Sequence, residues 1–507
     1  MQLDKQNQLF RILKRMSDNE IKYLKKFGYK INKDDSNILG LLDIIVKYRK
    51  DDMSNEDEII KRFQSKYKSA NYVKSKSRLL KFVLDGLYNY DRGEDDLNEL
   101  FELISIAESL AKRDLFRDSL YVLRKAEKIA SELEETSIMV YLKNKILKTE
   151  SYVRIYDIEQ LELLFETNND KLLAKLQKSI ETQKAAILVL AYQKAVGTPS
   201  KDKQFELLNK LQAMPAFKVS QNMIDSAAAL DMIIAKSGIG FMNGNHNFVL
   251  KESEKFIRSF SPPNRLFKRL TVKMIAFYDT FLQACLLTNS IQKFNDYFNC
   301  LERIETFSNK DQNLKSATIL YLSCMRALAE RKLDEFSSYS ESFYKISDIE
   351  SVPEYRKISI CYYLIIGSFM SGNHKASNKI IQFLKSKNNW GIREDVRTAI
   401  DLIELINHFE QNKTDLLEYE LRNYKQKMQQ TANNLSPTKI IPEYLSFTLK
   451  NENTNEKKTK LSAIIFEYEK QKSNDARELA FSNVFDFSIW MRSKLENVPV
   501  KLVFERH

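Results

Sequence analysis

Glycine and proline are scarce in this sequence, whose 507 residues include 11 Gly and 8 Pro. Both residues interrupt helices, and nearly all of them here stand between long stretches whose apolar residues recur with a helical period. Their shortage excludes frequent breaks within those stretches. The sequence therefore predicts an all-α protein.

Cysteine is scarcer still, with four residues far apart from one another. Each lies among apolar residues of a predicted helix, which is typical of a small core side chain in a reducing compartment. These residues are Cys285, Cys300, Cys324 and Cys361.

Long apolar runs are lacking as well. The longest runs, 185–192 and 361–370, fall well short of the roughly 20 residues that cross a bilayer. The polar first residues are unlike the basic and then apolar start of a secretory signal. We therefore expect no membrane span and a cytoplasmic location.

Length and composition point to a folded chain with more than one compact core. The 43% of hydrophobic residues, with 30 Phe and 24 Tyr, exclude wholesale disorder. A single core stops growing at about 250–300 residues, so this length needs several domains or a repeat array. No evident linker separates domains, which favours the array.

The charge is uneven along the chain. The formal net charge is +12, and residues 1–90 hold 20 Lys and Arg against 12 Asp and Glu. Eight of the twelve excess positive charges therefore lie in the first sixth of the chain. This asymmetry indicates that the N-terminal part meets an anionic partner.

The first 93 residues predict a basic module of five short helices. The expected helices cover residues 6–16, 18–27, 36–48, 59–67 and 71–90. Ser17 to Glu20 read as a capping box that opens the second helix. For the fifth helix we expect Val73, Leu80, Leu84 and Leu87 to face the core.

From residue 94 the pattern becomes one of paired helices, about 35 residues per pair, as in a superhelix of stacked hairpins. The clearest pair spans 100–113 and 116–133, where small residues such as Ala107 and Ser119 alternate with large ones. Small residues let two helices approach closely. Further pairs are expected at 266–307, 314–346, 363–380 and 396–428.

The pair built on Ala107, Phe116, Ser119 and Ala126 resembles a degenerate tetratricopeptide repeat over about 34 residues. This resemblance implies an α-solenoid of stacked antiparallel hairpins. The segments 9–27 and 485–495 together resemble a group of uncharacterised bacterial helical-repeat proteins. That group implies the same organisation and supplies no functional residues.

Interruptions at 197–200, 237–246 and 261–264 divide the array. The expected domains are the module 1–93, two repeat blocks 94–236 and 237–450, capping helices 451–497, and a tail 498–507. We expect residues 481–497 to form one last helix and Pro499 to end it. The alternating apolar residues of the tail predict an extended segment that can add to a partner's sheet through Val500, Leu502 and Phe504, or pack back on the last helix.

A basic stretch, residues 61–81, is the strongest local signal for a binding site because it carries eight cations and no acid. Such cations can bind phosphates, and Phe63, Tyr67 or Tyr72 can stack on bases if exposed. Alternatively, the aromatic rings face the core and the cations coat a solvated surface. The eight residues are Lys61, Arg62, Lys66, Lys68, Lys74, Lys76, Arg78 and Lys81.

No residue pattern indicates catalysis, a metal or a cofactor. The glycine-rich stretch 237–246 lacks the preceding strand and following lysine of a phosphate-binding loop, so we expect a turn there. The four histidines have no ligand spacing, and no nucleophile elbow or zinc-protease pattern occurs. We expect a protein that is not an enzyme, without cofactor or metal.

Together these features predict a non-catalytic scaffold or adaptor that binds protein partners on a solenoid surface. The alternative is a regulatory protein associated with nucleic acid or the ribosome and anchored by its basic N-terminal module.

Overall fold

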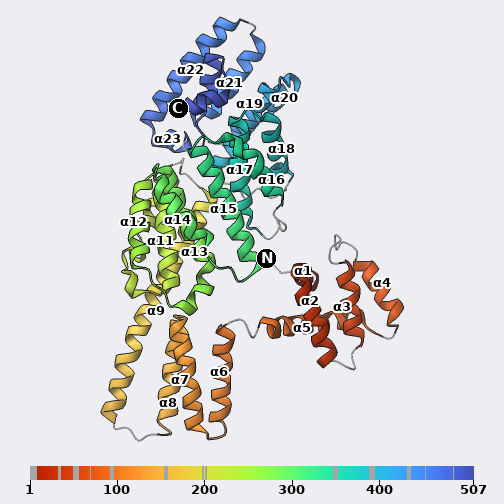
Figure 1. Cartoon of the computed structure of the whole chain (residues 1–507), viewed down its shortest axis with the longest axis vertical. Coiled ribbons are helices and arrows are strands. Elements are labelled where there is room, and N and C mark those ends of the chain that lie inside the picture. Colours follow the sequence, from red (N-terminus) through yellow and green to blue (C-terminus); the bar gives the residue numbers. More distant parts are fainter. Residues whose placement is uncertain are drawn as a thin grey trace. The chain divides into compact units, whose positions relative to one another are not determined.

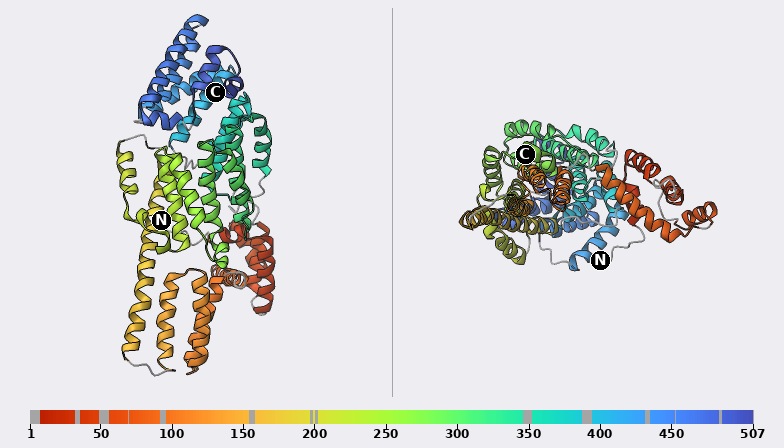
Figure 2. Two further views of the ribbon diagram at one scale, coloured as in Figure 1. Left: turned by 60° about the vertical axis from the view of Figure 1, so that its left-hand side comes forward. Right: turned by 90° about the horizontal axis from the view of Figure 1, so that it is seen from below.

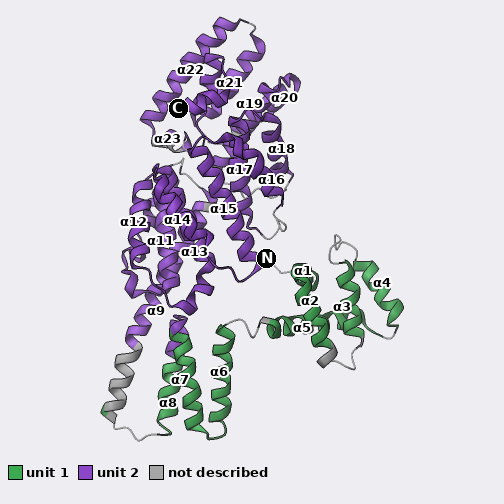
Figure 3. Ribbon diagram, in the orientation of Figure 1, with its two compact units in different colours: residues 1–131, 141–161 green, residues 132–140, 162–507 purple. Residues whose placement is uncertain are grey.

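The computed structural model shows an all-α protein (Figure 1). It describes residues 8–31, 36–48, 56–68, 70–91, 96–153, 158–196, 199, 202–345, 352–386, 394–430, 435–451, 453–482 and 485–506. Within these ranges every regular element is a helix, and no strand is present. The chain forms two compact units (Figure 3): unit 1 comprises residues 1–131 and 141–161, and unit 2 comprises residues 132–140 and 162–507.

Unit 1 opens with short helices that lie close to their predicted positions. They are α1 (Gln8–Arg15), α2 (Asp18–Ile31), α3 (Ser36–Tyr48), α4 (Glu56–Lys66) and α5 (Tyr72–Asp91). The expected capping box opens α2, because the Glu20 N–H donates to Ser17 Oγ at 3.2 Å and the Ser17 N–H donates to the Glu20 carboxylate. Leu13, Leu41 and Phe63 are fully buried between these helices.

The core face of α5 agrees only in part with the expected one. Leu80 and Leu87 are partly buried against the core as expected, but Val73 is 73% exposed and Leu84 is 45% exposed. The fully inward positions are Leu79, Phe82 and Val83. Several stripes of α5 have helical spacing, so periodicity alone does not fix the face that packs on α2 and α3.

Three further helices, α6 (Asp96–Ala111), α7 (Phe116–Glu132) and α8 (Thr136–Glu150), follow in the chain. Ser119 Oγ donates to the Ala107 carbonyl at 2.8 Å, and both residues are buried. The expected close approach at these small residues is therefore confirmed. On the other side of α6, Tyr141 and Lys145 of α8 both donate to Glu108 Oε1 at 2.8 Å.

Unit 2 is a solenoid of antiparallel helical hairpins (Figure 1, Figure 2). Its main helices are α9 (Ile158–Ala195), α10 (Asp202–Gln212), α11 (Ser226–Met242), α12 (His246–Ser259), α13 (Phe267–Leu287), α14 (Ile291–Glu302), α15 (Asn309–Ala329), α16 (Phe336–Lys345), α17 (Glu354–Met370), α18 (His374–Lys385), α19 (Glu394–Glu410), α20 (Thr414–Gln430), α21 (Ser436–Lys450) and α22 (Thr454–Asn474). The stacked hairpins that the sequence predicts are confirmed.

The first helices of successive hairpins form a continuous row. In this row α11, α13, α15, α17, α19 and α21 each pack against the next, while each second helix packs against its own first helix. Helices in the row are buried on more than one face, as α17 is from Ile360 to Met370, whereas α12 and α18 bury one stripe and expose the other. A helix that is apolar on several faces needs partners on both sides, and the row supplies them.

Six of the described hairpin turns share one backbone geometry. In each, the residue two positions before the second helix, or before its opening 3-10 turn, has a positive φ of 54–78°. The next residue donates its N–H to the carbonyl five residues earlier, at 2.7–3.2 Å, which satisfies a carbonyl at the end of the first helix. The residues with positive φ are Asp114, Gly244, Asn289, Arg331, Gly372 and Asn412.

The boundary expected at residues 236 and 237 falls inside α11. The helix continues through Gly238 and Gly240 to Met242, and the turn comes at Gly244. A Cβ atom on Gly240 would lie 2.4 Å from Val249 Cγ2 of α12. Glycine at this position therefore permits close packing of α11 on α12 and does not break the helix.

By length and composition one helical segment among the described residues, Asn264–Leu287, is apolar enough to cross a membrane. Its apolar window has a mean hydropathy of 1.3 and is 56% buried inside unit 2. A buried core helix meets the same criterion, and this segment contains α13, a member of the central row.

Three of the cysteines lie in the core as expected, and one does not. Cys285, Cys324 and Cys361 are fully buried, whereas Cys300 is exposed on α14. Burial raises the pKa of the Cys285 thiol to about 12, so that thiol stays protonated at neutral pH.

The C-terminal region differs from its prediction in two ways. In place of one last helix there are α23 (Ala476–Ser482) and α24 (Ser488–Glu496), and the expected extended tail is wrong because residues 500–506 form a helix, α25 (Val500–Arg506). Val500 and Val503 are buried, Phe504 packs beside them on the core, and Leu502 is exposed. The apolar residues at 500, 503 and 504 thus follow a helical period. As in the alternative expectation, α25 packs back on the helix before it, α24, and it also packs on α17.

Trp490 anchors the C-terminal helices to the solenoid. Its indole is fully buried against Phe409 and Tyr444, and Nε1 donates to Glu410 Oε1 at 2.7 Å. Lys494 Nζ donates to the other oxygen of Glu410 at 2.7 Å. The two contacts fasten α24 to α19.

A buried ion pair crosses the central row. Arg356 of α17 donates to Asp279 of α13, and both side chains are almost fully buried. Tyr321 of α15 places its ring 4.4 Å from the Arg356 guanidinium, and Gln283 Nε2 donates to Asp279 Oδ1 at 3.1 Å. The pair therefore links the first helices of three consecutive hairpins.

Removal of one partner of this pair is expected to destabilise unit 2 strongly. Asp279→Ala leaves the buried Arg356 charge without its carboxylate, at a cost of about 3–5 kcal/mol in the free energy of unfolding. Replacement of both partners, Asp279→Leu with Arg356→Met, should cost much less because no charge stays buried. Urea unfolding followed by circular dichroism measures the difference.

Asp334→Ala is the matched control, because Asp334 pairs with Lys501 at the surface at 2.9 Å. An exposed pair contributes about 0–1 kcal/mol. An Asp279→Ala variant as stable as this control would contradict a structural role of the buried pair.

Candidate functional site

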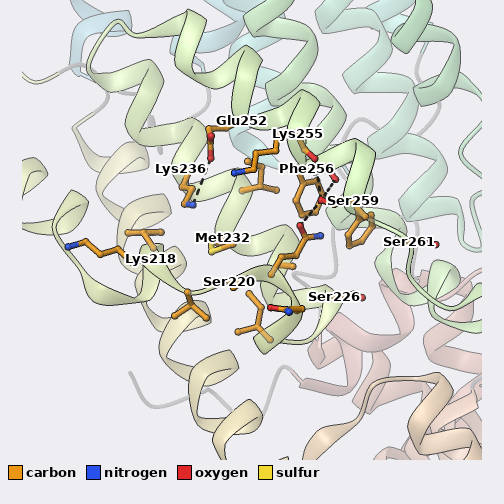
Figure 4. A pocket seen from close by; sticks show the side chains of 18 of the residues that line it. Lys218, Ser220, Ser226, Met232, Lys236, Glu252, Lys255, Phe256, Ser259 and Ser261 are labelled. Carbon is orange, nitrogen blue, oxygen red and sulfur yellow. Dashed lines mark hydrogen bonds and ion pairs between the residues drawn. The ribbon is translucent and has the colours of Figure 1, made fainter.

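Unit 2 contains a cavity with a volume of about 690 Å³ (Figure 4). It lies where the hairpin array is interrupted between α10 and α11, at two short 3-10 turns, η2 (Pro215–Lys218) and η3 (Gln221–Met223). Side chains of α9, α11 and α12 complete its wall. A cavity of this size falls within the range of ligand-binding pockets, about 300–1,000 Å³.

The floor of this pocket is apolar. It is made by side chains that the packing of η2, α11 and α12 buries, and they are Phe217, Ile224, Ala229, Met232, Ile233 and Phe256. These residues belong to the continuous core of unit 2. The floor is therefore held by the same packing that holds the first hairpin of the row.

The rim of the pocket carries an excess of positive charge. Four elements each contribute a lysine: Lys175 of α9, Lys218 of η2, Lys236 of α11 and Lys255 of α12. Only two carboxylates, Glu134 and Glu252, line the same pocket. Glu134 already accepts a hydrogen bond from the Ser226 backbone N–H at the start of α11.

Lys236 is half-buried, with a side chain only 22% exposed. Burial lowers the pKa of its ammonium group, and the nearby charge of Lys255 lowers it further while Glu252 opposes the shift. Glu252 stands 4.0 Å away, at the limit of an ion pair. Figure 4 shows Lys236, Glu252 and Lys255 beside one another on α11 and α12.

The mouth of the pocket is held by a hydrogen bond between two elements. Ser259 Oγ of α12 donates to Gln221 Oε1 of η3 at 2.9 Å. Ser220 and Asn222 are exposed beside Gln221, in the turn that this bond fixes. The rim thus offers hydroxyl and carboxamide groups beside the lysines.

A second cavity, of about 430 Å³, lies among α15, α22, α24 and α25. Its charged groups pair with one another, since Lys472 contacts Glu469 at 2.9 Å and Asp486 at 3.0 Å, and Arg492 contacts Glu469 at 3.3 Å. These pairs tie C-terminal elements together. The polar groups of this cavity therefore have a structural role already.

The eight cations of the predicted basic stretch lie on α4, α5 and the turn between them. Seven are exposed, among them Arg62, which pairs with Glu58 at 2.7 Å. Lys76 differs because it is half-buried, pairs with Glu56 at 2.6 Å and lies 4.8 Å from the Phe10 ring. Lys76 is therefore part of the fold of the module and not of its outer surface.

Two of the three aromatic residues of that stretch, Phe63 and Tyr72, fill the core, and the third, Tyr67, is half-buried against it. Phe63 is fully buried and Tyr72 nearly so, with ring centroids 5.9 Å apart. The Tyr72 hydroxyl donates to Glu56 Oε1 at 3.0 Å, and burial together with Glu56 raises the pKa of Tyr72 far above its usual value. Phe63 and Tyr72 are therefore not placed to stack on bases, and what remains outside is a surface of cations.

Sequence reasoning missed the lysine-rimmed pocket. Its residues come from segments that lie far apart in the chain, from Glu134 to Ser261, and none of them forms a local motif. The one local signal is the break around Pro215, where Pro and a run of polar residues separate two helices. That break shows an irregular connection but not the lysines that surround it.

Among the residues that the structure describes, no group of three or more His, Cys, Asp or Glu side chains is arranged to hold a metal ion. Comparison with protein-family models, with curated proteins and with solved structures finds no match for this chain. A function for this chain is therefore proposed from the geometry of its own residues.

Lys236→Met is expected to leave the free energy of unfolding at pH 7 unchanged or to raise it by about 0.5–1 kcal/mol, because burial penalises the ammonium charge. The folded pKa lies below the usual value of 10.5. Between those two pKa values the unfolded chain binds more protons than the folded one, so wild-type stability gains there as pH rises.

The advantage of Lys236→Met should therefore shrink between pH 7 and pH values near 10. Thermal unfolding of both proteins at several pH values in this range measures it. A large loss of stability in the variant at pH 7 would show that Lys236 holds the fold instead.

Proposed function

We propose that this chain is a non-catalytic protein-interaction scaffold whose helical hairpins, similar to tetratricopeptide repeats, present the lysine-rimmed pocket to a partner. The observation that carries the proposal is the combination of an apolar floor with an incompletely paired polar rim. Binding surfaces combine apolar contact area with a few polar groups that fix orientation.

The arrangement of the array supports the same proposal. Each hairpin contacts mainly its neighbours, so side chains on a solenoid surface can differ from hairpin to hairpin without loss of the fold. The pocket lies where a regular hairpin is replaced by η2 and η3. Function is often carried by irregular segments that a rigid scaffold positions.

Capture of partners with the tagged full-length chain tests the scaffold function. We expect Lys218→Glu with Lys255→Glu to lose discrete partners that the wild-type chain retains after nuclease treatment, because two exposed rim charges are reversed. Mass spectrometry of the co-purified proteins measures the loss.

Lys203→Glu with Lys439→Glu provides the control with the same change in net charge. Both lysines are exposed, on α10 and α21, and neither lines the pocket. Identical partners for the pocket variant and the control variant would count against the pocket as the docking site.

A second candidate is association with nucleic acid or the ribosome through α4 and α5. The observation that favours it is the set of exposed cations on these two helices and their turn. The rings of Phe63 and Tyr72 are buried, so binding would rest mainly on phosphate contacts and should weaken steeply with salt.

We expect the combined variant Lys66→Glu, Lys68→Glu, Lys74→Glu and Lys81→Glu to abolish such binding and keep its helicity, since all four side chains are exposed. Lys76 is left intact because it pairs with Glu56. Electrophoretic mobility shifts with single-stranded and double-stranded RNA at two salt concentrations measure the effect. Salt-independent or unchanged binding by the variant would reject the second candidate.

A further inference from the structure

The lysines of the pocket outnumber the carboxylates that line it, and few of them form ion pairs with described residues. On α11, Asp231 pairs with Lys273 at 2.5 Å, and on α12, Glu254 pairs with Lys293 at 2.5 Å. In the part of the chain that the structure describes, the four pocket lysines have a single ion pair, the 4.0 Å contact of Lys236 with Glu252. The pocket therefore has cationic groups without close carboxylate partners among the described residues, whereas the charges of Asp231 and Glu254 on the same helices are neutralised.

The position of Lys236 adds to this excess of positive charge. Its ammonium group is half-buried and 4.0 Å from the Glu252 carboxylate, and the charge of Lys255 stands beside it on the next helix. A half-buried ammonium group costs stability unless an opposite charge is close. A negative group of a ligand at this end of the pocket would therefore be attracted by both lysines.

The rest of the pocket indicates what else the ligand carries. Phe217, Met232 and Phe256 belong to the apolar floor, which suits a bulky apolar side chain. The exposed Ser220 and Asn222 present a hydroxyl and a carboxamide, which can pair with the N–H and C=O groups of a peptide backbone.

We infer that the pocket binds an acidic peptide segment of a partner protein, with a bulky apolar side chain against Phe217, Met232 and Phe256 and carboxylates against Lys236 and Lys255. This inference rests on the proposed scaffold function and names the chemistry that its partner presents. Charged groups at the rim fix the orientation of the segment, and the apolar side chain supplies most of the buried area.

Fluorescence anisotropy with the full-length chain tests this inference. The probes are three labelled synthetic peptides of equal length: one with Phe at the centre and Asp and Glu on both sides, one with Lys in place of the acids, and one acidic peptide with Ala in place of Phe. We expect the first to bind at least tenfold more tightly than the other two.

The variant Lys236→Met with Lys255→Met should weaken binding of the acidic Phe peptide at least tenfold, because both ammonium groups are removed while helical structure is kept. Lys203→Met with Lys439→Met is the control and should bind as the wild type does. Circular dichroism of each variant checks that it is folded. The single variant Lys255→Met, at an exposed position, removes one of the two positive charges and should weaken binding of the acidic Phe peptide to a smaller extent.

Equal binding of the acidic and basic peptides, or unchanged binding by the lysine variants, would overturn the inference. That result would leave the scaffold function standing if the capture experiment still shows partners lost with Lys218→Glu and Lys255→Glu. If the lysine-to-methionine variants still bind the acidic peptide and the variant Lys218→Glu with Lys255→Glu still captures the same partners, the pocket is rejected as a docking site.

Discussion

The hairpin turn is the constraint on which the solenoid depends. In six of the described turns the chain reverses through one left-handed residue, and the following N–H caps a carbonyl of the first helix. This geometry returns each second helix antiparallel along its own first helix. The first helices are then left to pack on one another in a row, and the buried pair of Asp279 and Arg356 spans three of them.

The pocket follows from an interruption of that regularity. Between α10 and α11 the chain passes through η2 and η3 in place of a tight turn. The space beside α11 and α12 is therefore lined by short turns, whose side chains leave a cavity of about 690 Å³. Apolar residues of the core form its floor, while the lysines that reach its rim come from four different elements. The same core packing thus sets the fold and the shape of the candidate site.

Helices and hairpins could be predicted from the sequence because their periods are local. Tertiary choices could not: on α5 both Val73 and Leu79 belong to helical stripes, and only packing on α2 and α3 decides between them. The tail was misjudged because residues 500, 502 and 504 alternate, whereas residues 500, 503 and 504 also fit a helix that packs on α17. The hairpins share little sequence because their turns have a backbone geometry in common and not a residue type. Asp114, Arg331 and Asn412 adopt it in some turns and glycine adopts it in others. The pocket combines residues that are distant in sequence, so no local pattern revealed it.

The central claim is that the lysine-rimmed pocket is the place where a partner docks. Photo-crosslinking from a photoreactive amino acid at position 220, on the exposed rim, tests it in the cell of origin most directly. The same amino acid at position 439, on the exposed face of α21, serves as the reference. We expect discrete crosslinked protein species from position 220 that are missing from position 439. The same species from both positions, or none from position 220, would contradict it.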